Sequence, residues 1–169
     1  PRTARGMVKR EVIRIVTPGT NLDMDSIEEG KNNFIFCILY SRQGKSGISV
    51  ADVTTGEFYM TETEGDRKIY DEIVRYSPSE IICNESFMLS GLDLTDLQER
   101  LGIIINTLGA HYFDDNAAEK VISAHFHVSS LIALGMDDKR AGSTAAGALL
   151  KYLYDTQKNS LSNITGINV

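Results

Sequence analysis

Three acidic residues stand where carboxylates could hold divalent metal ions. Asp52 ends an apolar run, Glu72 lies in a helical pattern, and Glu85 follows a short apolar strand pattern. Clustered carboxylates with paired Mg²⁺ ions can drive in-line attack on a phosphodiester. That chemistry requires a further acid in the central strand, yet the run from Phe34 to Tyr40 has none. Glu72 and Glu85 alone cannot form the metal cage, and Asp52 is better explained as a turn-forming acceptor before Thr54-Thr55-Gly56.

The sequence Gly44-Lys45-Ser46 resembles the end of a phosphate-binding loop. The first glycine of such a loop would fall at Leu39, inside a predicted strand, and a strand instead of a helix follows Ser46. We therefore predict a hairpin turn at this position.

The histidines and cysteines do not form a predicted metal site. His125 and His127 are two residues apart on a predicted helix and should point to different sides, and with His111 they make no common metal-binding face. Cys37 and Cys83 lie in predicted strands without partners at metal-ligand spacing, so we predict buried, reduced thiols.

A three-stranded antiparallel meander is predicted from residue 34 to residue 62. Its strands are Phe34 to Tyr40, Ile48 to Val53 and Glu57 to Glu62, separated by glycine-containing turns. The first strand is apolar on both alternating faces. A strand of this kind belongs in the middle of a sheet that is covered on both sides.

Two helices and two strands follow the meander. The helix opened by Gly65 and Asp66 carries Ile69, Ile73 and Tyr76 on one face and stops at Ser77-Pro78. Strand patterns cover residues 80–84 and 103–105. Between them, Thr95 and Gln98 form a capping-box pattern for a second helix.

The resulting order is β-β-β-α-β-α-β, in which helical crossovers bring the last two strands back parallel to the first. We predict an α/β fold with a ribonuclease H-like mixed sheet, made of the meander plus two parallel strands with flanking helices. This outline keeps open the alternative of a metal-dependent nuclease or resolvase, although topology is weak evidence for chemistry.

From Asp114 the pattern becomes helical. A first helix carries Ala118, Val121, Ile122 and His125 on one face, and a long second helix runs from Asp137-Asp138 to about Gln157. The second helix has a face of small and apolar residues, namely Ala141, Ala145, Ala148, Leu149, Tyr152 and Leu153. We expect much of the partner of this face to lie outside the chain.

Charge and composition limit the functions of the main body. The net charge is −6, although five basic residues precede Ile15, so duplex DNA should be repelled by most of the surface. No export signal precedes the first strand and no long apolar run could span a membrane. A cytoplasmic protein without membrane contact is expected.

Several sequence blocks, taken together and in order, resemble the bacterial MutS family of DNA mismatch-repair proteins. They span nearly the whole chain and comprise Lys9 to Thr20, Asn32-Asn33, Ala51-Asp52-Val53-Thr54-Thr55-Gly56-Glu57-Phe58, Ser77-Pro78-Ser79-Glu80-Ile81, Ala146 to Leu150, and Asp155 to Lys158. No single block would be specific.

The resemblance implies a division of the chain. Residues 1–20 would be the tail strand of a mismatch-reading domain, residues 21–110 a connector domain, and residues 111–169 the start of a helical core and lever region. The mismatch-wedging motif would lie before Pro1 and the nucleotide-binding loop after Val169. This chain would then hold no cofactor and have no activity of its own, while ATP, Mg²⁺ and mismatched duplex DNA would bind elsewhere in a homodimeric parent protein.

The resemblance further implies that the connector transmits conformational change and contacts a MutL-type partner. Flexible linkers are expected at Asn21 to Lys31 and at Gly109 to Asp114. The candidate partner surface is the polar side of the first helix after Asp115, and its residues are Asn116, Glu119, Lys120 and Ser123. An ordinary solvated helix face is the alternative.

Overall fold

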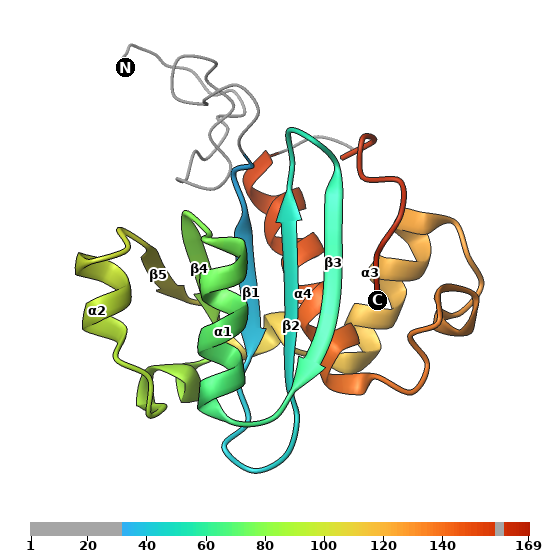
Figure 1. The fold of residues 1–169 in the computed structure, drawn as a ribbon. Coiled ribbons are helices and arrows are strands. Elements are labelled where there is room, and N and C mark those ends of the chain that lie inside the picture. The colour runs from blue at the N-terminus through green and yellow to red at the C-terminus, as the bar shows by residue number, and fades with distance from the viewer. Residues whose placement is uncertain (1–31, 158–160) are drawn as a thin grey trace, which may run out of the picture.

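A computed structural model describes residues 32–157 and 161–169 (Figure 1). The predicted strand from Val8 to Val16 and the linker from Asn21 to Lys31 lie outside these residues. The strands are β1 Ile35–Leu39, β2 Ser46–Asp52, β3 Glu57–Thr63, β4 Glu80–Cys83 and β5 Ile104–Thr107. The α-helices are α1 Asp66–Tyr76, α2 Leu94–Glu99, α3 Asp115–Phe126 and α4 Arg140–Gln157, with short 3₁₀ helices η2 Glu85–Leu89, η3 Ala110–Tyr112 and η4 Leu131–Leu134.

The five strands form one mixed sheet in the order β3-β2-β1-β4-β5. β1 pairs antiparallel with β2 and parallel with β4, β2 is antiparallel to β3, and β4 is parallel to β5. The predicted α/β fold, with a meander plus two parallel strands, is confirmed. Gly44, with φ +101°, lies in the β1–β2 hairpin where a phosphate-binding loop was rejected.

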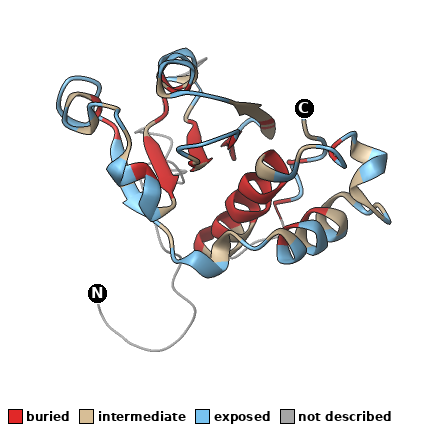
Figure 2. Cartoon of the chain, turned by 90° about the horizontal axis from the view of Figure 1, so that it is seen from below, coloured by how far each residue is buried: buried red, intermediate tan, exposed pale blue. Residues whose placement is uncertain are grey.

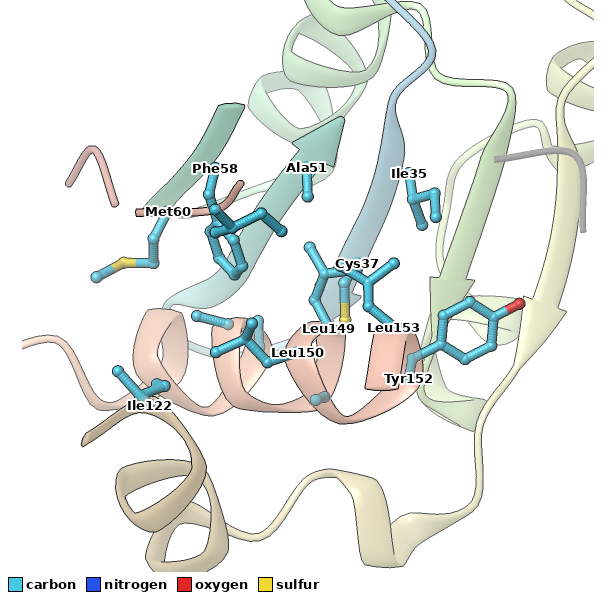
Figure 3. Close-up of a cluster of buried hydrophobic side chains, with 14 of the residues drawn as sticks. Ile35, Cys37, Ala51, Phe58, Met60, Ile122, Leu149, Leu150, Tyr152 and Leu153 are labelled. Atoms are coloured by element: carbon cyan, nitrogen blue, oxygen red, sulfur yellow. The ribbon is translucent and has the colours of Figure 1, made fainter. Parts of the chain in front are cut away.

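β1 is central and buried on both faces, as its alternating apolar residues predict. Phe36 and Ile38 pack on one side with Ile69 and Ile73 of α1. Ile35 and Cys37 point to the other side, where α4 lies (Figure 3). The two faces of the sheet thus build two separate apolar cores.

α4 is the main cover of the second face, and its residues from Gly142 to Leu150 are all buried (Figure 2). The helix packs against β1, β2, β3 and α3. The expectation that its partner lies outside the chain is therefore wrong. A glycine of the sheet permits the close approach of α4, because a Cβ on Gly47 of β2 would come within 1.9 Å of the Ala141 carbonyl oxygen.

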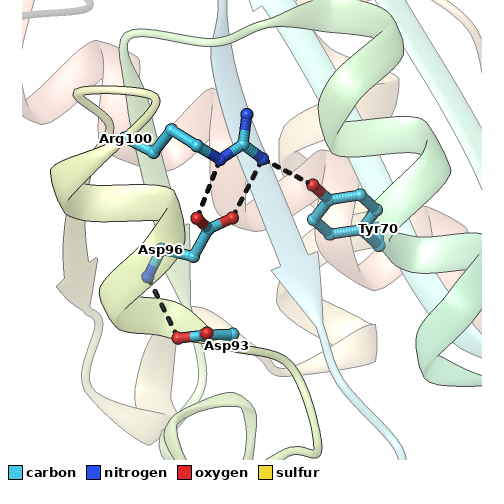
Figure 4. A network of polar contacts seen from close by, with 4 residues as sticks. All are labelled: Tyr70, Asp93, Asp96 and Arg100. Atoms are coloured by element: carbon cyan, nitrogen blue, oxygen red, sulfur yellow. Dashed lines mark hydrogen bonds and ion pairs between the residues drawn. The ribbon is translucent and has the colours of Figure 1, made fainter.

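Two helix starts differ from the sequence prediction. Asp93 caps α2, since its side chain accepts a hydrogen bond from Asp96 N at 3.0 Å, so the capping box from Thr95 to Gln98 is wrong. α4 begins at Arg140 instead of Asp137. Arg100 closes α2 with two bonds to the Asp96 carboxylate and a third, of 2.9 Å, to the Tyr70 hydroxyl of α1 (Figure 4). This network joins the two helices on the first face of the sheet.

None of the described helices combines the length and the apolar character needed to span a bilayer.

Candidate functional site

The carboxyl ends of β1 and β4 lie side by side. A nuclease of ribonuclease H type, the alternative left open by the sequence, would gather its acids here. Instead, Asn84 joins the two strands through Tyr40: its Oδ1 accepts from Tyr40 N at 2.9 Å and its Nδ2 donates to Tyr40 O at 3.0 Å. Asp66 at the start of α1 accepts from the Tyr40 hydroxyl at 2.6 Å and from Gly91 N at 2.7 Å. The hydrogen bond to Asp66 raises the pKa of Tyr40. Both carboxylate oxygens of Asp66 thus accept hydrogen bonds from neutral groups of the protein itself.

The three acids singled out by sequence do not meet. Glu85 is exposed at the start of η2. Glu72 pairs with Arg75 at 3.7 Å on the solvent side of α1. Asp52 lies at the opposite end of the sheet, because β2 runs antiparallel to β1. Within residues 32–157 and 161–169, no group of three or more His, Cys, Asp or Glu side chains is placed to hold a metal ion. The geometry gives the nuclease alternative no support.

Asp52 instead organises the β2–β3 turn. Its Oδ1 accepts from Thr54 N at 2.9 Å and from the Thr54 hydroxyl at 2.5 Å, and its Oδ2 accepts from Asn33 N at 2.9 Å. Burial opposes ionisation of this carboxyl, but the hydrogen bonds from Thr54, Asn32 and Asn33 outweigh it and lower the pKa of Asp52. Its predicted role as a turn acceptor is confirmed.

The four candidate partner residues lie on α3 but do not share one surface. Asn116, Glu119 and Lys120 are exposed. The hydroxyl of Ser123 is buried and has no hydrogen-bond partner among the described residues. Asn116 and Glu119 line a hollow of about 360 Å³ with residues of the α3–α4 connection. Lys120 lines a different hollow, of about 330 Å³, between α3 and α4.

The two hollows differ in charge. The first is lined by the acids Asp115, Glu119, Asp137 and Asp138, opposed by Arg140, whose Nη2 lies 2.6 Å from Asp115 Oδ2. An acid-rich hollow of this kind favours cationic groups, but such a cluster alone does not define a site.

The second hollow, here called the lysine hollow, is lined by Tyr112, Ala117, Ala118, Lys120, Val121, Gly147 and Lys151. The Lys151 ammonium lies 5.5 Å from the centre of the Tyr112 ring. The Tyr112 hydroxyl donates to Asp155 at 2.7 Å, and burial together with this bond raises the pKa of Tyr112 to about 12. Sequence reasoning missed Tyr112 and Lys151. The signal for Lys151 was a lone cation within the otherwise apolar run from Ala148 to Tyr154.

His127 is not on a helix, contrary to the sequence prediction. It caps α3 with φ 58°, and both His125 and His127 line one hollow of about 470 Å³. The His125 ring nitrogens face protein oxygens: Nδ1 lies 2.5 Å from the Tyr154 hydroxyl, and Nε2 lies 2.7 Å from Ile164 O. His125 therefore joins α3, α4 and the last described segment.

Comparison with known families decides which kind of domain carries this geometry. The family described as MutS domain II matches residues 33–165. The chain belongs to the MutS domain II family. This confirms the resemblance found in the sequence blocks.

Similar relatives include DNA mismatch repair proteins named MutS. The chain is 51% identical to that of Lachnoclostridium phytofermentans over 99% of its own length and 18% of the relative's. It is 38% identical to that of Acetivibrio thermocellus over 100% of its own length and 19% of the relative's. The protein from Ruminiclostridium cellulolyticum is 35% identical, with 99% and 19% covered. The chain thus spans about a fifth of the MutS proteins it matches.

Proposed function

We propose that this chain is the non-catalytic connector module of a mismatch-repair ATPase of the MutS family. It relays conformational change between the mismatch-binding, clamp and ATPase regions and helps to recruit a MutL-type protein. The observation that carries the proposal is β1, whose five residues are all apolar and lie at the centre of the sheet. In a ribonuclease H-like arrangement, which we propose for this sheet, that strand would have to supply a metal-binding acid. Its composition favours a mechanical role.

We propose that the connector extends through α4, whereas the resemblance implied that it ends at residue 110 and that the core and lever region begins at residue 111. α4 packs on β1, β2 and β3, α3 packs on α4, and α4 contributes more buried residues to the second core than any other element. The MutS domain II match also runs from residue 33 to residue 165 without a division. Removing α4 would expose Ile35 and Cys37 of the central strand.

A connector of this kind would work as a stiff body that turns about its edges. Apolar cores on both sheet faces resist internal shear, because close-packed side chains have few alternative arrangements. Motion would then concentrate where chain segments leave the domain. Under the same proposal, other regions of a homodimeric, cytoplasmic parent protein bind ATP, Mg²⁺ and mismatched DNA.

The proposed partner surface is the exposed side of α3 with the lysine hollow beside it. Asn116, Glu119 and Lys120 are available to a partner, whereas the buried Ser123 hydroxyl is not. Lys120 and Lys151 line the lysine hollow together with the apolar residues Ala117, Ala118 and Val121. The lysine hollow therefore favours a partner segment that presents an acidic group beside an apolar side chain.

Charge reversal tests this surface in the full-length parent protein. The variant Glu119→Lys/Lys120→Glu keeps the net charge and should weaken binding of the MutL-type protein about tenfold, since charges at an interface rim govern association. A matched control is Glu64→Lys/Lys68→Glu, a second exposed pair, in which Glu64 precedes α1 and Lys68 lies in its first turn. Binding is measured by surface plasmon resonance, with thermal melting to verify folding. Equal binding by both variants would refute this recruitment surface.

A further inference from the structure

The β2–β3 turn, residues 52–57, is where the first and last described segments of the chain meet. The start of β1, this turn and the segment after residue 161 lie at the same end of the sheet (Figure 1). We call residues 32–34 the incoming segment and residues 161–168 the outgoing segment. They are separated by more than a hundred residues in sequence, yet each bonds directly to the same short turn.

The incoming segment is held by the carboxylate of Asp52. Asp52 Oδ2 accepts from Asn32 Nδ2 and from Asn33 N, each at 2.9 Å. The Asn32 amide also donates to Glu57 on the far side of the turn. Because the other Asp52 oxygen holds Thr54, one carboxylate fixes the incoming segment and the shape of the turn together. Hydrogen bonds to an ionised acceptor are roughly twice as strong as those between neutral groups.

The outgoing segment attaches to the other side of this turn. Asn163 Nδ2 donates to the backbone oxygen of Val53, which is the residue after Asp52. The backbone oxygen of Asn163 lies against Gly56, where an added Cβ would come within 2.2 Å of it. Gly56 has φ +82°, a conformation that glycine adopts without strain. The turn is therefore shaped to receive the outgoing segment at close range.

Beyond the turn, the outgoing segment follows the outer edge of β3. Ile164 is buried in the second core, and its carbonyl faces His125. Asn168 then pairs with β3: its N–H donates to Phe58 O at 2.9 Å and its O accepts from Met60 N at 2.7 Å. The Met60 amide thus reports whether this segment is docked.

We propose that the β2–β3 turn is a mechanical junction that couples the incoming to the outgoing segment, with Asp52 as its positioning residue. This inference rests on the proposed relay function, for which it supplies a path. The path crosses only Asp52 and Val53, two consecutive residues at the margin of the second core, and does not run through β1. Its hydrogen bonds join the buried Asp52 and Val53 to the exposed residues Asn32 and Asn163, so they can open without unfolding the sheet.

Amide hydrogen exchange in this 169-residue chain tests the junction. Asn32→Ala removes the side-chain amide that bridges Asp52 and Glu57. The substitution changes no residue of the outgoing segment, so any effect there must pass through the turn. We expect the Met60 amide to exchange about tenfold faster, the effect of losing a hydrogen bond to a charged group. Amides of Phe36 and Ile81 in the central strands should be unaffected. Asp52→Asn should accelerate Met60 exchange at least as much, and the Phe36 amide verifies that this variant is folded.

Ser79→Ala is the matched control. The Ser79 hydroxyl donates to Asn33 Oδ1 at 2.8 Å, so this variant loosens the same incoming segment away from the turn. It should leave Met60 exchange within about twofold of the wild type. The junction is refuted if Asn32→Ala leaves Met60 exchange unchanged or if Ser79→Ala accelerates it equally. Because exchange needs neither a partner nor the parent protein, this result is independent of the recruitment experiment that tests the proposed function.

Discussion

Replacing Gly47 with alanine tests the close contact between α4 and the sheet. The new Cβ would lie 1.9 Å from the Ala141 carbonyl oxygen and 2.2 Å from its carbon. Non-bonded carbon–oxygen contacts begin at about 3.3 Å, so the start of α4 would have to withdraw by roughly 1 Å or more. A gap of that size forfeits about a quarter to a half of the dispersion attraction along the contact. The loss falls on Ala145 and Leu149, which pack in the second core.

The magnitude follows from two opposing effects. Overpacking a core costs about 1–3 kcal/mol, and we expect the upper end because both sides of this clash are backbone-linked. Alanine in a strand recovers about 0.5–1 kcal/mol relative to glycine. The net loss of unfolding free energy should be about 2 kcal/mol, which lowers the urea midpoint by roughly 1 M for an m-value of about 2 kcal/mol/M.

The control for this experiment is Gly166→Ala. Its Cβ would meet no atom within 4 Å, and its φ lies outside the left-handed region. The unfolding free energy should change by less than about 0.5 kcal/mol. Should the Gly47 and Gly166 variants unfold at the same urea concentration, the proposed withdrawal of α4 would be wrong.

Two further predictions concern pH. The pKa of Asp52 is lowered in the folded chain, so its stabilising effect is present above about pH 4 and is lost as pH falls through the folded pKa. The difference in urea midpoint between wild type and Asp52→Asn should therefore shrink from pH 7 to pH 3, and a constant difference would contradict this. The pKa of Tyr112 is raised to about 12, so its contribution is complete below about pH 10 and is lost as pH rises toward 12. Wild type and Tyr112→Phe should thus converge in stability between pH 9 and pH 12, and a gap that widens over this range would refute the assignment.

The central sheet could be predicted from sequence because its signals are local. Alternating apolar residues in Phe34 to Tyr40 specify burial on both faces, and Gly44 and Gly56 mark turns that need positive φ. The environment of α4 could not be predicted in the same way. Alanine and glycine pack closely against many surfaces, so the residues from Gly142 to Leu150 do not identify β2 and α3 as their partners.

The exposure of the candidate residues on α3 was predicted only in part. Helical spacing correctly placed Asn116, Glu119 and Lys120 in solvent. It could not predict that the Ser123 hydroxyl is buried, nor that Lys151 of α4 lines the lysine hollow together with Lys120. These features depend on how separate elements pack, and helical periodicity describes each element alone.

The contacts at the two ends of the sheet explain why the proposed relay would concentrate motion at one of them. At the carboxyl ends of β1 and β4, Asn84 bonds both backbone groups of Tyr40 and ties the strands together. At the opposite end, Asp52 and Asn163 hold segments that lead out of the sheet by part-buried hydrogen bonds in which Asn32 and Asn163 are exposed. Contacts of the second kind open at lower free energy than buried strands. Force that enters at Asn32 should therefore reach the outgoing segment through the β2–β3 turn before it disturbs β1.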